Sequence, residues 1–303
     1  MTRSRRFGLA ATALAFGGGL GAQSVATYYP LVVQLPVSVR SQGMGGAWTA
    51  GRDADAVFSN PANAGASGMN LGGSRFGSAS SAGHAATGLS FGSTGLSLGV
   101  AWLDYGTPSG APVPWRALGE RGDDDGLSAQ AVVAGTMTYR GIRWGGAARL
   151  LEERIANAHD GTIGFDIGAA REFGQISTGI AVLNIGRTLD VQGRKAFLPT
   201  RYSLGASAGS YPIGPLDVAA VAAADIRRDG RFSPAGGVEL SYSWLDGYVV
   251  SFRAGARRFE AESLNPLTVG ASFGLDRFVV DYALMDLRAP ARGTIHSLAL
   301  RVR

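Results

Sequence analysis

Large apolar residues alternate with small or polar residues along most of the chain from about residue 70 onward. Leu267, Val269, Ala271, Phe273 and Leu275 occupy every second position of one segment, with threonine, glycine or serine between them. Side chains point alternately to the two faces of a strand. This segment therefore predicts a β-strand with one apolar face and one small, polar face.

Segments of this kind recur about fourteen times, each roughly ten residues long, which is typical of a transmembrane strand. We predict strands at 70–78, 86–93, 95–105, 127–139, 142–151, 161–172, 175–185, 198–209, 215–228, 231–244, 248–260, 265–275, 277–288 and 293–303. A soluble β-sandwich would also alternate, so the alternation by itself leaves both architectures open.

Aromatic residues favour the membrane barrel, because they recur on the apolar face at the ends of the segments. Amphipathic rings in that position suit the two membrane interfaces. They are Trp102, Tyr139, Trp144, Tyr202, Tyr242, Trp244, Tyr248 and Phe278. The predicted fold is therefore an all-β, transmembrane antiparallel β-barrel of about 14 strands.

Charged residues lie mid-segment on the opposite face, among glycine, serine and alanine. That composition indicates a crowded barrel lumen rather than a face in contact with bulk water. The lumen charges are Arg149, Asp166, Arg201, Glu239, Arg253, Arg257 and Asp281. We expect them to pair with one another or with a segment inside the barrel, since buried charges need partners; a selective ion path is the alternative.

The predicted connections alternate in length. Arg140-Gly141 and Asp246-Gly247 are tight turns, whereas residues 106–126, 152–160 and 186–197 form longer, more polar connections. Outer-membrane barrels place short turns in the periplasm and long loops outside. We therefore expect the longer connections to face outward.

The amino terminus predicts export. Arg3, Arg5 and Arg6 precede a short apolar stretch at 7–20, so we interpret residues 1–22 as a signal peptide and expect the protein in the bacterial outer membrane. The chain has 303 residues but no cysteine, which excludes disulfides and a lipidated cysteine. Charged residues make up 17%, against roughly 25% in soluble domains, which fits a surface facing lipid.

Residues 23–69 differ from the barrel segment at 70–303, because they are irregular and punctuated by proline. A barrel of this size has a lumen that needs filling. We predict that residues 23–69 form a plug inside it, with lumenal arginines as the partners of Asp53 and Asp55. A disordered periplasmic tail is the alternative.

The same region resembles the amino-terminal signature of the FadL superfamily of outer-membrane barrels, most closely its PorV/PorQ branch. The resemblance rests on three short motifs within about 20 residues. They consist of Gly43, Met44, Gly45, Gly46 and Ala47; Asp53 and Asp55; and Asn60, Pro61 and Ala62.

The resemblance implies a 14-stranded barrel whose amino-terminal segment folds inside as a hatch. FadL members carry hydrophobic compounds across the outer membrane, and PorV-type members act in type IX secretion. The expected partners are thus outer-membrane lipid and either a small hydrophobic ligand or a secreted protein cargo. A structural, non-conducting barrel and a weakly selective porin remain open.

The sequence predicts no enzyme, cofactor or metal site. None of the three histidines has a serine and an acid placed beside it. Asp123, Asp124 and Asp125 could bind calcium, although a solvated loop is the stronger interpretation. Gly43 to Gly46 lack the lysine and helix of a phosphate-binding loop. The arginines are scattered, which excludes a nucleic-acid interface.

Overall fold

The computed structural model describes residues 29–76, 80–105, 126–155, 158–191, 194–245, 247–258, 264–287 and 293–302. The predicted signal peptide at 1–22 and the aspartates at 123–125 lie outside the described residues.

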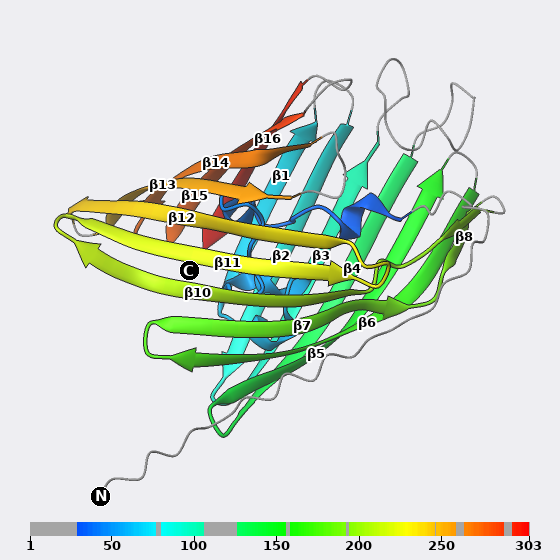
Figure 1. The fold of residues 1–303 in the computed structure, drawn as a ribbon, viewed down its shortest axis with the longest axis horizontal. Helices are drawn as coiled ribbons and strands as arrows, with labels where there is room; N and C mark the ends of the chain where they lie inside the picture. The colour runs from blue at the N-terminus through cyan, green and yellow to red at the C-terminus, as the bar shows by residue number, and fades with distance from the viewer. Residues whose placement is uncertain are drawn as a thin grey trace, which may run out of the picture.

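Within those residues, fourteen strands form one closed antiparallel barrel (Figure 1). The predicted barrel of about 14 strands is thus confirmed. Its first seven strands are β1 (Gly68–Phe76), β2 (Ser80–Phe91), β3 (Thr94–Asp104), β4 (Gly126–Tyr139), β5 (Ile142–Ile155), β6 (Ala158–Phe173) and β7 (Ile176–Gly186). The others are β10 (Arg201–Ile213), β11 (Leu216–Arg227), β12 (Phe232–Leu245), β13 (Tyr248–Arg257), β14 (Leu264–Leu275), β15 (Phe278–Leu287) and β16 (Gly293–Val302). Pairing of β1 with β16 closes the ring.

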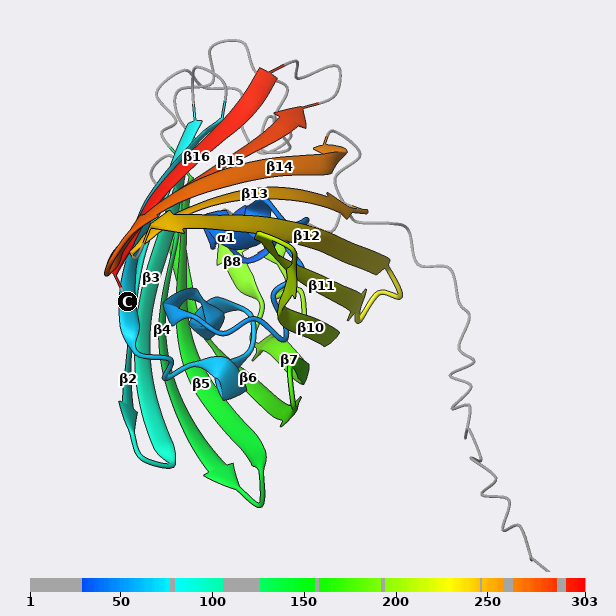
Figure 2. The same ribbon diagram turned by 90° about the vertical axis from the view of Figure 1, so that its left-hand side faces the viewer.

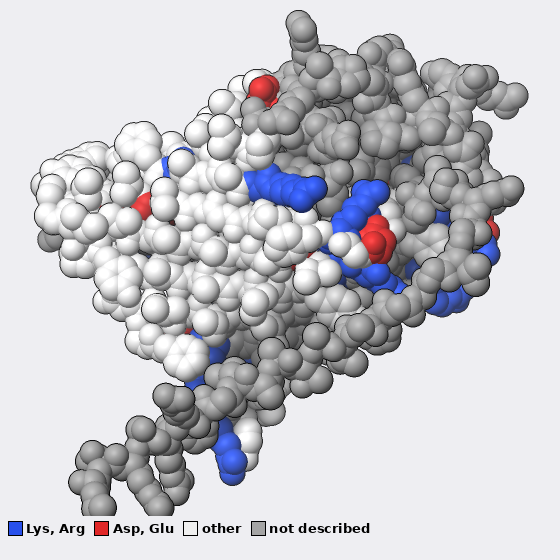
Figure 3. Space-filling view, viewed as in Figure 1, with Lys and Arg blue, Asp and Glu red and all other residues white. Residues whose placement is uncertain are grey.

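The alternation predicted from the sequence separates an apolar outside from a polar inside. In β14, Leu267, Val269 and Phe273 are exposed, whereas Thr268 and Ser272 are buried. The face of the barrel seen in Figure 3 is largely uncharged, with most charged side chains toward the strand ends. An exposed apolar surface of this extent on an isolated chain is stable only against hydrocarbon or another apolar surface.

The two rims differ as the sequence predicts, with one correction. Arg140 and Gly141 have φ angles of 52° and 75° and form the two-residue turn between β4 and β5. The connection predicted at 152–160 is wrong, because β5 continues to Ile155 and β6 begins at Ala158. Leu151 and Glu153 face inward and are buried there, so inward packing extends these strands beyond the predicted ends.

A small hairpin lies within the connection between β7 and β10. Its strands are β8 (Leu189–Val191) and β9 (Arg194–Ala196). Leu189, Val191 and Ala196 are buried, and β8 contacts the neighbouring β6 and β5. The sequence predicted a plain loop at 186–197, so its buried apolar residues are a feature that the prediction missed.

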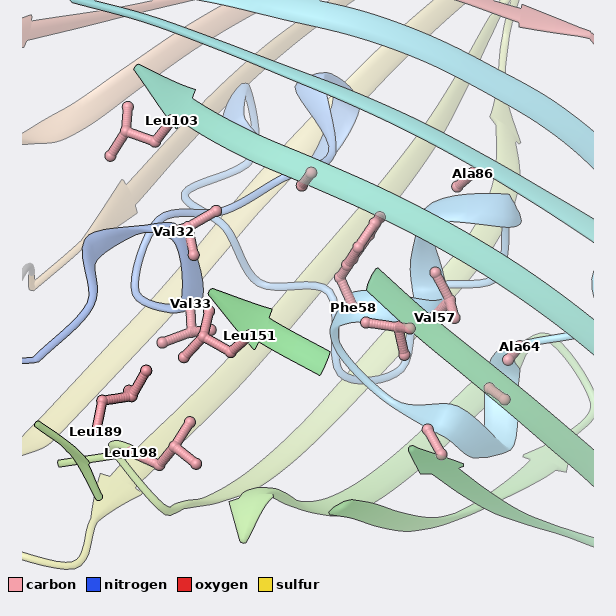
Figure 4. Packing of buried hydrophobic residues seen from close by; sticks show 14 of the residues in the cluster. Val32, Val33, Val57, Phe58, Ala64, Ala86, Leu103, Leu151, Leu189 and Leu198 are labelled. Carbon is pink, nitrogen blue, oxygen red and sulfur yellow. The ribbon is translucent and has the colours of Figure 1, made fainter. Parts of the chain in front are cut away.

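Residues 29–67, which we call the amino-terminal segment, run within the ring of strands in Figure 2. The segment contains four short helices: η1 (Leu31–Val33), α1 (Val39–Gln42), η2 (Ala54–Phe58) and η3 (Pro61–Asn63). Among the described residues no helix is long and apolar enough to cross a membrane. The core of the protein therefore lies between this segment and the inner faces of the strands, as the close view in Figure 4 shows.

Candidate functional site: the barrel interior

The Gly43–Ala47 loop packs against glycines of the barrel wall. Gly45 has a φ of 70° and its backbone N–H donates to Oγ1 of Thr268, 3.0 Å away. Any β-carbon on Gly255 of β13 would overlap the backbone of Met44 and Gly45. Only glycine permits such a close approach of two backbones together with a positive φ. The glycines of this motif thus serve packing against the wall.

The Asn60-Pro61-Ala62 motif forms a fixed turn on the opposite side of the interior. Asn60 is extended, with φ −157° and ψ 108°, as expected for a residue before proline. Its side-chain oxygen accepts from the backbone N–H of Ala62 at 3.0 Å, and its amide donates to the carbonyl of Thr49 at 2.8 Å. A β-carbon on Gly145 of β5 would overlap Pro61, so the turn lies directly on the wall.

The largest group of lumen charges is a chain of alternating signs that begins in the amino-terminal segment. Arg40 of α1 pairs with Glu239 at 2.6 Å, and Glu239 also accepts from Arg253. Arg253 pairs with Asp281 at 2.8 Å, and Asp281 pairs with Arg301 at 3.1 Å. Four strands and one helix are thereby joined through charges that have little access to water.

A second group centres on Asp225 of β11. It pairs with Arg257 at 2.7 Å and lies 3.8 Å from Arg201, and it accepts a hydrogen bond from Ser203 at 2.5 Å. Two bonds lead from this group to the amino-terminal segment. Arg257 donates to the carbonyl of Gly46 at 3.3 Å, and the Ser203 hydroxyl lies 2.5 Å from that of Thr49.

The third group joins β5, β6 and β7. Arg149 pairs with Asp166 at 2.6 Å and donates to the side chain of Gln130. Gln130 in turn donates to the carbonyl of Val32 in η1 at 3.1 Å. Asp166 also accepts from the backbone N–H of Asn184 at 2.6 Å, where the β6–β7 register shifts. All seven predicted lumen charges thus lie in these three groups.

The prediction that lumenal arginines bond to Asp53 and Asp55 is wrong. Asp53 accepts from the indole N–H of Trp48 at 3.0 Å, and Asp55 accepts from the amide of Asn70 and lies 3.7 Å from His84. The charge contributed by the segment to the lumen networks is instead Arg40. Both aspartates follow Gly51 in a tight turn around η2, which directs them toward Trp48 and β1–β2 rather than β12–β16.

Burial raises the pKa of Asp53 to about 6, and the nearby Asp55 carboxylate adds to this effect. Arg301, Arg40 and the Trp48 hydrogen bond act in the opposite direction and only partly offset it. Asp53 therefore favours the protonated form in the folded protein far more than a free aspartate does.

One side of the interior is apolar. Val32, Val33 and Phe58 of the amino-terminal segment pack in one cluster with wall residues such as Leu103 and Leu151 (Figure 4). The β8–β9 hairpin adds Leu189 and Ala196 to the same cluster. The cluster faces β2 to β5, while two of the three charged groups belong to β10 to β16. The interior thus has a side where apolar contacts predominate, with the Arg149 group beside them, and a side where charges predominate.

Two small cavities lie between the amino-terminal segment and the wall. Each has a volume of about 40 Å³; one is lined by Trp48, Asp225 and Arg257, and the other by Val32, Leu35 and Leu103. Such spaces are large enough for one or a few water molecules. Neither holds a substrate-sized molecule in this conformation.

Solved structures are similar to the chain in fold. One is the toluene transporter TodX of Pseudomonas putida, with a TM-score of 0.54 and 12% identity over 91% of this chain and 97% of that chain. Another is a Pseudomonas aeruginosa FadL homologue, with a TM-score of 0.58 and 11% identity over 89% of this chain and 99% of that chain. The chain has a FadL-like fold. No protein-family model and no curated protein matches its sequence.

The charge chain through Glu239 predicts a large loss of stability when it is broken. Glu239→Ala leaves Arg40 and Arg253 buried with one anion fewer, which should cost ~3–5 kcal/mol of unfolding free energy. Glu152→Ala is the control, because Glu152 forms a solvent-exposed pair with Arg154 and should lose less than about 1 kcal/mol. Urea unfolding in lipid vesicles measures both; equal losses would contradict the role of the chain.

Asp53 predicts a pH dependence of stability. The pKa of Asp53 in the folded protein, about 6, exceeds the ordinary 3.8. The contribution of Asp53 to the free energy of unfolding is therefore fully present below pH 4 and is lost as the pH rises through 6. Asp53→Asn stays neutral and keeps an oxygen for Trp48. Between pH 4 and pH 8, the free energy of unfolding of Asp53→Asn should rise by about 2–3 kcal/mol relative to that of the unmodified chain. A difference that stays constant over this range would show that Asp53 ionises normally.

Proposed function

We propose that the protein is an outer-membrane barrel for the passage of small hydrophobic molecules, with residues 29–67 as a plug that gates it. The observation that carries the proposal is the apolar side of the interior. Open porin channels are lined by polar side chains. Here Val32, Val33 and Phe58 cover an apolar inner wall at Leu103 and Leu151, which suits a hydrophobic solute better than a hydrated ion.

In this proposal the plug moves to open a path, since the two cavities described between it and the wall, of about 40 Å³ each, are too small for a solute. Its two sides are held differently. Ion pairs and hydrogen bonds from Arg40, Gly46 and Thr49 attach it to β10–β13. Toward the opposite wall it makes apolar contacts through Phe58, together with neutral hydrogen bonds such as the one from Gln130 to the carbonyl of Val32. Apolar contacts have no fixed direction and an apolar solute can replace them. We infer that passage opens along the apolar side.

The membrane setting of this proposal follows from three observations. The outer surface is apolar, the fold is shared with a toluene transporter and a FadL homologue, and residues 1–22 have the pattern of a signal peptide. The proposal places the two-residue turns in the periplasm and the longer connections outside.

A disulfide lock tests the gate. The chain has no cysteine, so Val57→Cys with Gly99→Cys forms the sole possible disulfide. It joins η2 to β3 on the apolar side, where a β-carbon on Gly99 would lie 2.7 Å from Cγ1 of Val57. The assay is uptake of radiolabelled toluene and of a radiolabelled long-chain fatty acid by intact bacteria that lack their own transporters. Uptake of at least one probe should exceed the host background, fall to background when the lock is oxidised, and return after reduction.

The matched control joins two wall strands. The hydroxyls of Ser241 and Ser251 lie 2.9 Å apart on β12 and β13, and cysteines there should not alter uptake in either redox state. Full uptake by the oxidised Val57–Gly99 lock would refute gating by the plug. Uptake of both probes at background by the unmodified chain would refute the transport proposal itself.

A second candidate is a docking barrel for a secreted protein, as the PorV/PorQ resemblance of residues 43–62 implies. The closed interior supports it, because a docking platform needs no path through the barrel. Under this candidate the unmodified chain takes up neither probe, and an exported protein co-purifies with it. Neither candidate involves catalysis.

A further inference from the structure

The outer surface of the barrel carries a groove of about 1250 Å³ over β3 to β7. Val100 and Trp102 of β3 and Ile163 and Phe165 of β6 form its apolar walls. Between them, Ala129 of β4 pairs with Trp102 in register. The groove exists because the small residues Ala129 and Ala131 of β4 lie beside the larger outward residues of β3 on one side and of β5 and β6 on the other.

Basic side chains gather at one end of this groove. Arg154 and His159 are neighbours on β5 and β6, and Arg187 follows the end of β7. Arg154 pairs with Glu152 at 3.2 Å and remains about half exposed, whereas Arg187 makes no ion pair with any residue that the structure describes. The groove therefore offers two exposed guanidinium groups against one carboxylate.

Acidic residues at the same end of β5 and β6 mostly face the other way. Glu153 is fully buried and accepts a hydrogen bond from the Tyr105 hydroxyl at 2.8 Å. Asp160 accepts from the backbone N–H of Asp190 at 2.6 Å. Among the residues that line the groove, the alternation of the strands thus leaves Glu152 as the carboxylate beside Arg154 and Arg187.

The basic end lies at the level of lipid headgroups. Trp144, at the other end of β5, is exposed among the interfacial aromatic residues. Arg154 is ten residues further along the strand, or ~33 Å along its axis. With a strand tilt of about 40°, that distance spans ~25 Å along the membrane normal, which is the height of the apolar band of such barrels. Arg154 thus falls at the interface on the rim of the longer connections.

We propose that this groove binds a phosphorylated, multi-acylated glycolipid of the outer leaflet. Its acyl chains lie along Val100, Trp102, Ile163 and Phe165, and its phosphates meet Arg154 and Arg187. Arginine forks match phosphate oxygens and form charge-assisted hydrogen bonds with them.

A second outer groove shows why the charges matter. It measures about 880 Å³ over β5 to β12 and is lined by residues such as Ile180, Leu204 and Phe232, without a charged side chain. Membrane hydrocarbon of any kind fits such a surface. The groove with the basic end differs from it in having groups that select an anionic headgroup.

Binding to the purified full chain in detergent tests the proposal, with bisphosphorylated hexa-acyl lipid A as the probe and native mass spectrometry as the readout. The unmodified chain should bind one lipid A, and the monophosphorylated form more weakly. Arg154→Gln with Arg187→Gln should weaken lipid A binding at least tenfold. Glu152→Gln should strengthen it, because it removes the competing carboxylate.

The control variant is Arg231→Gln, which removes an exposed arginine of the same rim that does not line the groove. It should bind lipid A like the unmodified chain. Lipid A binding that is absent, or equal in the double variant and the unmodified chain, would overturn the site. Cardiolipin also has two phosphates but carries four acyl chains. Binding of cardiolipin as strong as that of lipid A would overturn the assignment to the glycolipid and indicate an anionic phospholipid instead.

Discussion

A charge inside the barrel has little bulk water to solvate it and must find a partner within the protein. This constraint shapes the interior more than any other. Arg253 and Asp281 are almost fully buried, and their opposite charges come from other strands. They pair with each other across β14, Arg253 also pairs with Glu239 of β12, and Asp281 also pairs with Arg301 of β16. Glu239 then requires a second cation, and Arg40 of the amino-terminal segment provides it. The wall and the segment are therefore parts of one electrostatic unit.

Close packing also makes the barrel wall and the amino-terminal segment depend on each other. Gly255 and Gly145 bring the wall close to the segment, so the backbone at Met44 and at Pro61 fills space that any side chain would occupy. Removing the segment would leave a void and would take from Glu239 one of its two cations. On the apolar side, by contrast, Phe58 and Leu103 make contacts that another apolar molecule could replace. This asymmetry between the two sides is the physical basis of the proposed gate.

The strands and the orientation of their side chains could be predicted from the sequence, because a period of two positions assigns each residue to one face. Asp166, Arg253 and Asp281 were placed in the lumen on that basis. Partners inside the irregular segment have no such period. Arg40 was missed because α1 has four residues, and its pairing with Glu239 spans 199 positions. Arg301 could have been found, since it follows the alternation of β16.

The most direct test of the account is the ionic conductance of the barrel without residues 41–65, measured in planar bilayers. The full chain should be silent, and the shortened chain should conduct, because it lacks most of the proposed plug. Shortened chains whose barrel is still intact are identified by their resistance to unfolding in detergent at low temperature. Conductance that is the same in both folded chains would contradict the claim that this segment closes the barrel.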